Sequence, residues 1–245
     1  MSSLVYTRYE LLRTFRNRQF FAFSLGFPLV LFFLIAGPNR NDHDLASSGL
    51  SALVYYMVGL ASFGTMSGVL SSGARIAGER SIGWNRQLRL TPLSARSYFR
   101  AKIVTAYAMA LASIIALDAA GTTLGVRLPP DRWLSMTALM LVALIPFAAL
   151  GILGGHLLTT DTIGPAMGGS TALFAFLGGT WFPISGHGVL HAIAECLPSY
   201  WLVRASHVAL GGRAWTATGW IVIAAWTVCA ALLAGWAYRR DTGRI

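Results

Sequence analysis

The chain has 245 residues, of which 55% are hydrophobic and 11% are charged, and its formal net charge is +10. A soluble domain carries about 25% charged residues, so this composition excludes an ordinary soluble domain and indicates one membrane domain over residues 1–245. Two cysteines, Cys196 and Cys229, are too few for a disulfide framework. Cys229 lies in a predicted span and suits apolar packing. Cys196 is expected outside the membrane, where an intermolecular disulfide is an alternative to a free thiol.

Residues 1–18 combine four arginines with aliphatic and aromatic side chains. This pattern predicts an amphipathic helix in the membrane interface, with its arginines facing anionic headgroups. The uncharged stretch that follows predicts a first spanning helix over residues 20–36, with a kink at Pro28. Its apolar run exceeds the ~7–15 residues of a signal peptide, and no small-x-small cleavage site follows, so we expect it to be retained.

Five further stretches predict spanning helices, because a bilayer is crossed by about 20 mainly apolar residues. The third span reaches that length only by running through Asp118. The class we predict is an all-α polytopic membrane protein with six transmembrane helices. These spans cover residues 20–36, 50–72, 103–124, 134–157, 163–182 and 217–238. Small-xxx-small glycine pairs, which allow close packing within the chain, occur at Gly64/Gly68, Gly151/Gly155 and Gly164/Gly168.

Residues 183–213 are apolar but broken by glycines and prolines, with histidines, Glu195 and Arg204 among them. A seventh span here would disturb the distribution of charge. Broken backbone at membrane depth has to be buried in protein, so we predict short re-entrant helices on the external side, before the last span.

The basic residues indicate the orientation in the membrane. With both termini inside, 14 of the 19 Lys and Arg residues lie on the inner side and five lie outside. This asymmetry follows the positive-inside rule for an even number of spans. We therefore expect both termini to be cytoplasmic in a bacterial plasma (inner) membrane. Because this topology explains the net charge, we expect no nucleic-acid partner.

The inner loop, residues 74–102, is the most informative segment. Ile82, Trp84 and Leu88 fall on one face of a short predicted helix that Pro92 ends. A projecting amphipathic helix fits a partner's groove, although a basic loop on anionic lipid has the same chemistry. The chain contains no G-x-x-x-x-G-K-[ST] phosphate-binding loop. If ATP drives this protein, a separate subunit hydrolyses it, and this chain binds no cofactor of its own.

The loop resembles that of ABC-2 type permeases. The resemblance rests on Glu79-Arg80-x-x-Gly83, on Leu88-x-x-Thr91-Pro92, and on Tyr98 and Lys102 before the next span. The basic amino-terminal helix, the six spans and the broken segment with Leu197-Pro198-Ser199-Tyr200-Trp201 also fit the family. In one respect the chain departs from many relatives, which carry Thr-Leu-Glu after the loop glycine where this chain has Trp84-Asn85-Arg86.

The resemblance implies a permease subunit that dimerises, with an identical copy or a paralogue, and docks two cytoplasmic ABC ATPase subunits holding ATP and magnesium. Compact permeases of this length resemble drug and antibiotic exporters, which implies efflux of a hydrophobic or amphipathic small molecule. The residues implied in coupling to the ATPase are Glu79, Arg80, Gly83, Trp84, Leu88 and Pro92.

Asp118 is the one acidic residue inside a predicted span. An intramembrane carboxylate is a candidate cation or proton site, so a secondary transporter or channel is the alternative function for this chain. A simpler explanation of Asp118 is that it lies near the outer interface and faces water. Tyr55 and Tyr56 are candidates for a substrate pathway, although such aromatics equally suit lipid contact. His156 is expected to be a hydrogen-bonded helix residue.

His187, His191 and Glu195 are spaced so that they share one face of a helix, as zinc ligands can. A membrane metalloenzyme is therefore a third hypothesis. Gly186 and Gly188 weaken such a helix, and no fourth ligand is evident, so we expect no metal. No pattern for nucleophilic catalysis or H-E-x-x-H zinc chemistry is present, and we expect no enzyme activity in this chain alone.

Overall fold

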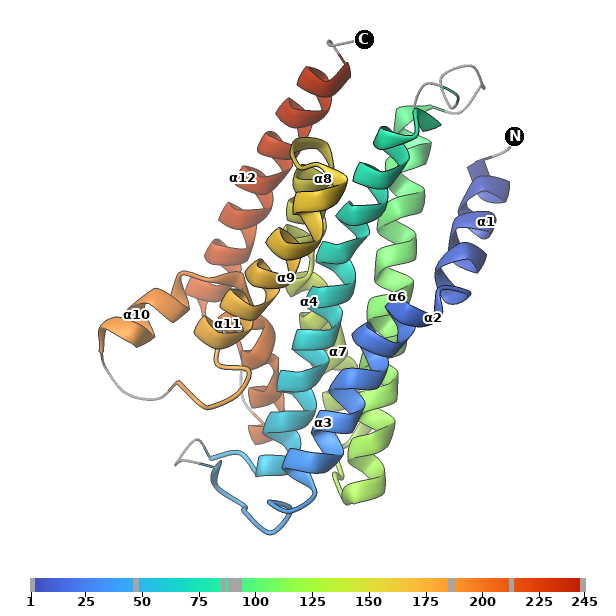
Figure 1. Ribbon diagram of the computed structural model, residues 1–245. Helices are drawn as coiled ribbons and strands as arrows, with labels where there is room; N and C mark the ends of the chain where they lie inside the picture. The colour runs from blue at the N-terminus through green and yellow to red at the C-terminus, as the bar shows by residue number, and fades with distance from the viewer. Residues whose placement is uncertain are drawn as a thin grey trace.

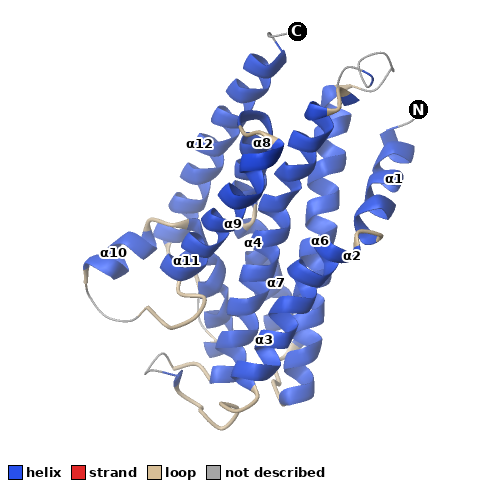
Figure 2. Ribbon diagram, viewed as in Figure 1, coloured by secondary structure: helices blue, strands red, loops and turns tan. Residues whose placement is uncertain are grey.

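The computed structural model describes residues 3–45, 49–84, 87, 94–184, 188–211 and 214–242 (Figure 1). Every regular element in these ranges is a helix and none is a strand (Figure 2), which confirms the predicted all-α class. The helices are α1 (Ser3–Phe15), α2 (Arg18–Phe21), the π-helix η1 (Ala22–Gly26), α3 (Phe27–Ala36), α4 (Ala52–Ser81), α6 (Ala95–Leu124), α7 (Pro130–Ala143), α8 (Ile145–Leu157), α9 (Thr160–Leu177), α10 (Val189–Glu195), α11 (Pro198–Arg204), the 3-10 helix η3 (Ala205–Leu210) and α12 (Ala217–Thr242).

Local chemistry accounts for where the two longest helices begin. Ser51 precedes α4, and its hydroxyl accepts a hydrogen bond from the Val54 amide. Ser94 does the same for α6 through the Ser97 amide. Such caps satisfy amide groups that have no partner inside the helix. Gly125 ends α6 with a φ of 110°, a backbone conformation that glycine adopts without steric cost.

Four helices of the described chain are long and apolar enough to cross a membrane: Ala52–Ser81, Arg96–Leu124, Pro130–Leu157 and Ala217–Arg240. They correspond to four of the six predicted spans. The first predicted span appears as a shorter apolar helix, Ser24–Ala36. The fifth corresponds to the 18-residue helix α9, which begins with the polar residues Thr160, Asp161 and Thr162.

The helix α4 forms the centre of the bundle. Its apolar window is 83% buried, whereas that of α12 is 22% buried. It packs against α6, α8 and α9, and α8 in turn packs against α12. The outward side of α12 carries large exposed apolar side chains, which suits contact with lipid; they are Trp220, Ile221, Val228, Leu232, Leu233 and Trp236.

Two of the predicted spans are interrupted. The π-helical turn η1 immediately precedes the turn that contains Pro28, and this is where the sequence predicts a kink. The fourth span is divided at Leu144 into α7 and α8, with Pro146 in the first turn of α8. Proline is tolerated there because the first amides of a helix have no partner in any case.

Figure 1 shows that α1 begins and α12 ends at the same end of the bundle, where α4 also ends and α6 begins. At the opposite end, α3 leads into α4 and α6 leads into α7. The short helices α10 and α11 lie beside the bundle in the half that is remote from the termini. Following the orientation predicted from the sequence, we call the end with the termini the inner end and the opposite end the outer end.

Candidate functional site

A group of charged and polar side chains joins three helices at the inner end. We call it the inner polar cluster. Its members come from α1, α4 and α6, and the most buried of them are less than 5% exposed. It consists of Glu10, Arg13, Thr14, Arg75, Glu79, Tyr98 and Lys102.

Lys102, the single lysine of the chain, lies at the centre of the cluster. Its Nζ is 2.6 Å from Glu10 Oε1 and 2.6 Å from Glu79 Oε1. The other Glu79 oxygen, Oε2, accepts a hydrogen bond of 2.7 Å from the Tyr98 hydroxyl. Arg13 approaches Glu79 Oε1 at 3.2 Å from the solvent side. Glu79 therefore binds partners from α1 and from α6 at the same time.

A second contact strengthens the attachment of α1 to α4. Arg75 donates a hydrogen bond to the Thr14 hydroxyl, which itself donates to the Glu10 carbonyl at 2.8 Å. A buried ion pair adds little net stability, because dehydration of the charges offsets their attraction. Loss of one partner is nevertheless costly. The cluster thus fixes how α1 lies against α4 and α6.

The inner polar cluster adjoins the residues predicted to contact the ATPase. Tyr6 on α1 is buried, and its ring lies 6.2 Å from that of Tyr98. Burial, followed by the neighbouring charges of Glu79 and Glu10, raises the pKa of Tyr6 above its ordinary value. The Trp84 side chain lies beside Tyr6. The start of the inner loop is therefore in contact with α1.

The structure separates the predicted coupling residues by environment. Glu79 is 2% exposed and is directed into the chain. Arg80 donates hydrogen bonds to two carbonyls at the end of α8, those of Gly155 at 2.9 Å and Leu158 at 3.3 Å. Gly83 has a φ of 71°, and Trp84 is 37% exposed. Leu88 and Pro92 lie outside the described residues.

Sequence reasoning missed Glu10, Arg13 and Thr14 as partners of the inner loop. One signal was present, because Glu10 is the only carboxylate on an otherwise basic amino-terminal helix. A second was the solitary lysine, which was noted as part of the resemblance but not assigned a partner. Buried lysine requires a carboxylate, so the two observations together point to a pair.

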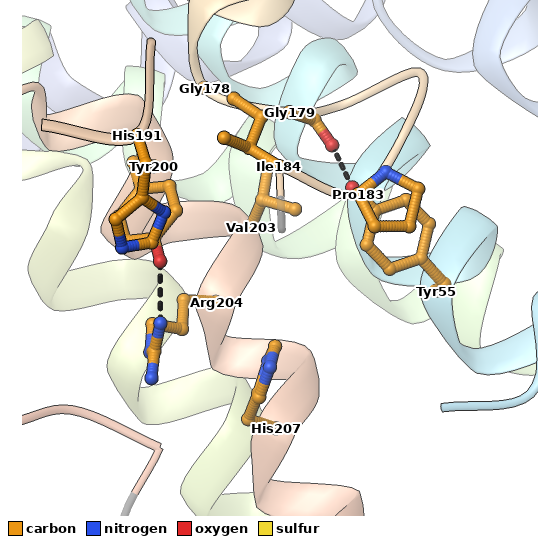
Figure 3. Close-up of a pocket in the computed structure, with 10 residues that line it drawn as sticks. All are labelled: Tyr55, Gly178, Gly179, Pro183, Ile184, His191, Tyr200, Val203, Arg204 and His207. Carbon is orange, nitrogen blue, oxygen red and sulfur yellow. Dashed lines mark hydrogen bonds between the residues drawn. The ribbon is translucent and has the colours of Figure 1, made fainter. Parts of the chain in front are cut away.

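A second site lies at the outer end and is shown in Figure 3. We call it the outer cavity; its volume is about 210 Å³. It is formed by the beginning of α4, the segment after α9, and α10, α11 and η3. The lining residues are Tyr55, Gly178, Gly179, Pro183, Ile184, His191, Tyr200, Val203, Arg204 and His207.

Hydrogen bonds hold the walls of the outer cavity in place. Tyr55 on α4 donates to the carbonyl of Gly179, so α4 is bound to the segment after α9. Arg204 donates from Nε to the Ala214 carbonyl at 3.2 Å and from Nη1 to the Tyr200 hydroxyl. Its guanidinium lies 5.6 Å from the centre of the Tyr200 ring and 5.6 Å from that of Trp201. These contacts fix the guanidinium at the cavity wall.

Tyr55 therefore lies at a cavity, as a residue of a substrate pathway would. Tyr56 packs edge-on against Tyr55, with 5.8 Å between ring centres, and is not among the lining residues. Asp118 is half-buried on α6 and forms no hydrogen bond or ion pair with any residue in the described ranges. It lies about 24 Å along the helix from Lys102, at 1.5 Å per residue. The two candidate regions do not include it.

Of the three candidate metal ligands, His191 Nε2 and Glu195 Oε1 are 3.4 Å apart. His187 lies outside the described residues, and within them no group of three potential ligands is close enough to hold a metal. His156 is buried at the end of α8, where its ring packs edge-on against Phe99 and Tyr238.

These features define an all-helical protein with four candidate membrane-spanning helices, whose inner loop begins in contact with its amino-terminal helix. A family model described as "ABC-2 family transporter protein" matches residues 36–237, and the chain belongs to this family. It is also similar to the "Putative transport permease YvfS" of Bacillus subtilis (strain 168), with 29% identity over 198 residues, which cover 78% of each chain. The chain is thus a membrane transport permease, as its inner loop predicts.

Proposed function

We propose that this chain is the membrane subunit of an ATP-binding-cassette exporter in a bacterial plasma membrane. It moves a hydrophobic or amphipathic, drug-like compound outward, and a separate cytoplasmic ATPase subunit, which binds ATP and magnesium, supplies the energy. The observation that carries this proposal is the inner polar cluster. It connects the inner loop, the amino-terminal helix and two long helices through buried charges.

The surface beside the cluster suits a protein partner. Ile82 is 72% exposed and Trp84 is 37% exposed, directly after α4. Large apolar side chains in such positions mark an interaction site when polar residues surround them. Trp84 lies beside Tyr6 on α1, and α1 is joined to α4 and α6 by the inner polar cluster. A subunit that binds Trp84 and displaces the loop would therefore move all three helices.

The proposed topology has six spans with both termini in the cytoplasm. It is supported by the common end at which α1 begins, α4 ends, α6 begins and α12 ends (Figure 1). In this arrangement α2, η1 and α3 form the first span, α9 forms the fifth, and α10, α11 and η3 are re-entrant from outside. The excess of basic residues at the inner end then faces the cytoplasm and its anionic lipids.

The proposal includes a second permease copy. On α9, a Cβ atom at Gly164 or Gly168 would meet no described atom within 4 Å, so this small-residue face is open. By contrast, the equivalent pair in α8 packs closely on α4, since a Cβ at Gly155 would lie 2.7 Å from the Ile76 Cβ. A helix face without bulky side chains supports close approach of another helix in the membrane.

Co-purification with the ATPase tests the proposal. The tagged chain is expressed with neighbouring gene products, extracted in mild detergent and assayed for ATP hydrolysis and for export from vesicles. We expect a stoichiometric ATPase subunit that is lost, or uncoupled from export, in Trp84→Ala. Trp236→Ala is the matched control, because it removes an exposed tryptophan from the lipid-facing side of α12 near the same end. Normal coupling in Trp84→Ala contradicts the docking assignment.

The alternative is a secondary transporter or channel that uses Asp118. The observation that favours it is the half-buried Asp118 carboxylate, which has no hydrogen bond or ion pair within the described part of the chain. In that case the chain purified alone transports in response to an ion gradient, and Asp118→Asn abolishes this transport. Gradient-independent, ATP-dependent export that Asp118→Asn leaves unchanged excludes it.

A further inference from the structure

The outer cavity contains hydrogen-bond donors that the protein does not use. A guanidinium has five N–H groups, and within the described residues Arg204 donates two hydrogen bonds. The Tyr200 hydroxyl accepts one of these and keeps its own proton to donate. The Nδ1 atom of His191 is buried and has no hydrogen-bond partner among the described atoms. All three side chains line the same space (Figure 3).

The charge of the outer cavity is positive. None of the described lining residues is acidic, and Arg204 carries a full charge. Glu195 contacts the lining residue His191 through the Nε2 atom of His191. The undescribed neighbouring segments 185–187 and 212–213 contain no carboxylate in the sequence. A cation is disfavoured here, and an uncharged ligand leaves the guanidinium without a counter-charge.

The remaining walls of the outer cavity are apolar. Pro183, Ile184 and Val203 line it beside the charged group. Arg204 is therefore bordered by surfaces that suit a hydrocarbon chain.

The size of the outer cavity limits what it can enclose. Its volume of about 210 Å³ is below the roughly 300–1,000 Å³ of sites that enclose a drug-sized molecule. A compact acidic group and a short length of chain fit this space, whereas an entire amphipathic molecule does not.

We propose that the outer cavity binds the acidic head group, a carboxylate or phosphate, of an amphipathic anion whose apolar part begins against Pro183, Ile184 and Val203. Arg204 and Tyr200 donate to the anionic oxygens, as charged hydrogen bonds to oxyanions require. This inference goes beyond the proposed function, and it holds whether or not an ATPase drives transport. The anion has two sources, an exported compound or an anionic phospholipid of the outer leaflet.

Binding of dodecyl phosphate to the purified chain tests the proposal without any ATPase. The chain is placed in nanodiscs of phosphatidylcholine, and binding is followed by calorimetry, with dodecyl trimethylammonium as the cationic comparison. We expect saturable binding of the phosphate only. Arg204→Gln should weaken it about tenfold or more, and Tyr200→Phe about three- to tenfold, since each removes a hydrogen bond to a charged group.

Arg132→Gln is the matched control. Arg132 also lies at the outer end and donates to a carbonyl of η3, that of Ala209 at 2.8 Å, but it does not line the outer cavity. The proposal requires that this variant bind normally. Equal binding of both amphiphiles, or equal loss in Arg132→Gln and Arg204→Gln, overturns it. If Arg204→Gln fails to fold, Tyr200→Phe, which keeps the ring, decides the question, and unchanged affinity in it overturns the proposal.

Adding phosphatidylglycerol to the nanodiscs distinguishes the two sources. If the phospholipid occupies the outer cavity, it competes with dodecyl phosphate in the unmodified chain, and the competition disappears in Tyr200→Phe. If the site serves an exported anion, dodecyl phosphate binds equally in both lipid compositions. Either result supports an anion site, and failure of saturable binding in both compositions excludes one.

Discussion

Glu79 receives contacts from side chains that are 19, 23 and 66 residues away in the sequence, those of Tyr98, Lys102 and Arg13. The sequence pattern places Glu79 in a loop that faces an ATPase, and a role in coupling stays a prediction. Its burial changes the mechanism we expect for that role. We expect Glu79 to position α1 and α6 relative to α4, and the exposed Trp84 to make the direct contact with a partner.

Replacement of Lys102 measures the strength of this attachment. In Lys102→Met, two buried carboxylates lose their shared cation, and we expect a loss of about 3–5 kcal/mol of stability, the usual cost of removing one member of a buried pair. Thermal unfolding in detergent, followed by tryptophan fluorescence, should show a clearly lower midpoint.

A second substitution separates loss of charge from loss of packing. Glu10 forms an ion pair with Lys102, whereas Glu79 binds Arg13 and Tyr98 in addition to Lys102. Addition of Glu10→Gln to Lys102→Met should therefore restore part of the stability. If Lys102→Met leaves the unfolding midpoint unchanged, the charges are solvated and the inner polar cluster does not hold α1 against α4 and α6.

His207 predicts a pH dependence at the outer cavity. Burial, and then the charge of Arg204, lowers the pKa of His207 below its ordinary 6.5. Because the folded chain resists protonation there, the unoccupied fold loses stability as the pH falls below about 6.5. A bound anion offsets that cost, so affinity for an anion should increase over the same range, by about threefold between pH 7.5 and 5.5.

The pH measurement requires a probe whose own charge is constant. Octyl sulfonate meets this requirement, and its affinity is compared in the unmodified chain and in His207→Gln. His191, which also faces the cavity and pairs with Glu195, is present in both. The increase at low pH should be smaller in His207→Gln. An identical profile in the two proteins assigns the effect to His191 and contradicts the prediction for His207.

At the scale of elements, glycine determines how closely α4 and α8 approach. A Cβ atom at Gly73 would collide with the carbonyl oxygen of Gly151, and one at Gly151 would lie 2.9 Å from that of Val69. The backbones of the two helices are thus in direct contact. Backbone atoms cannot rotate away as a side chain can, so the contact leaves no room for a methyl group.

Gly73→Ala should consequently destabilise the chain by about 3 kcal/mol, at the upper end of what overpacking costs. Gly78→Ala is the control on the same helix, because a Cβ at Gly78 would meet nothing within 4 Å. It should be neutral or slightly stabilising, since alanine favours helix by about 1 kcal/mol over glycine. Equal unfolding midpoints for the two variants would refute close α4–α8 packing.

The elements were predictable to the extent that hydrophobic runs determine them. Four predicted spans correspond to helices of sufficient length, and the kink predicted at Pro28 falls beside a π-helical turn. The division of the fourth span at Leu144 was not predicted, although Pro146 signalled it. Polar residues at the start of α9 shorten its apolar part. The span was predicted from a run of uncharged residues, and such a run does not distinguish threonine and glycine from strongly apolar residues.

At the scale of the whole molecule, the candidate sites were less predictable than the helices. The loop motif identified the region of Glu79, but its partner helix could not be read from local pattern, because the Lys102–Glu10 pair spans 92 residues. The outer cavity likewise joins α4 to a segment more than 120 residues later. Long-range packing decides such contacts, and hydrophobic periodicity carries no information about it.

The open face of α9 makes a prediction about assembly. A chain carrying Gly168→Cys in a Cys196→Ser, Cys229→Ser background should form disulfide-linked dimers on mild oxidation in membranes, because small residues allow two α9 helices to approach. Val228→Cys, on the lipid-facing side of α12, is the control and should stay monomeric. Cross-linking at Val228 but not at Gly168 places the contact between copies on α12 instead.

The length of α4 has a mechanical consequence. Tyr55 and Glu79 lie on the same uninterrupted helix, separated by about 36 Å at 1.5 Å per residue. Over that length, a tilt of α4 by about 5° around its inner end displaces its outer end by about 3 Å. This displacement exceeds the distance over which a hydrogen bond persists. The hydrogen bond from Tyr55 to the Gly179 carbonyl therefore breaks under a rotation too small to disrupt the packing around Glu79.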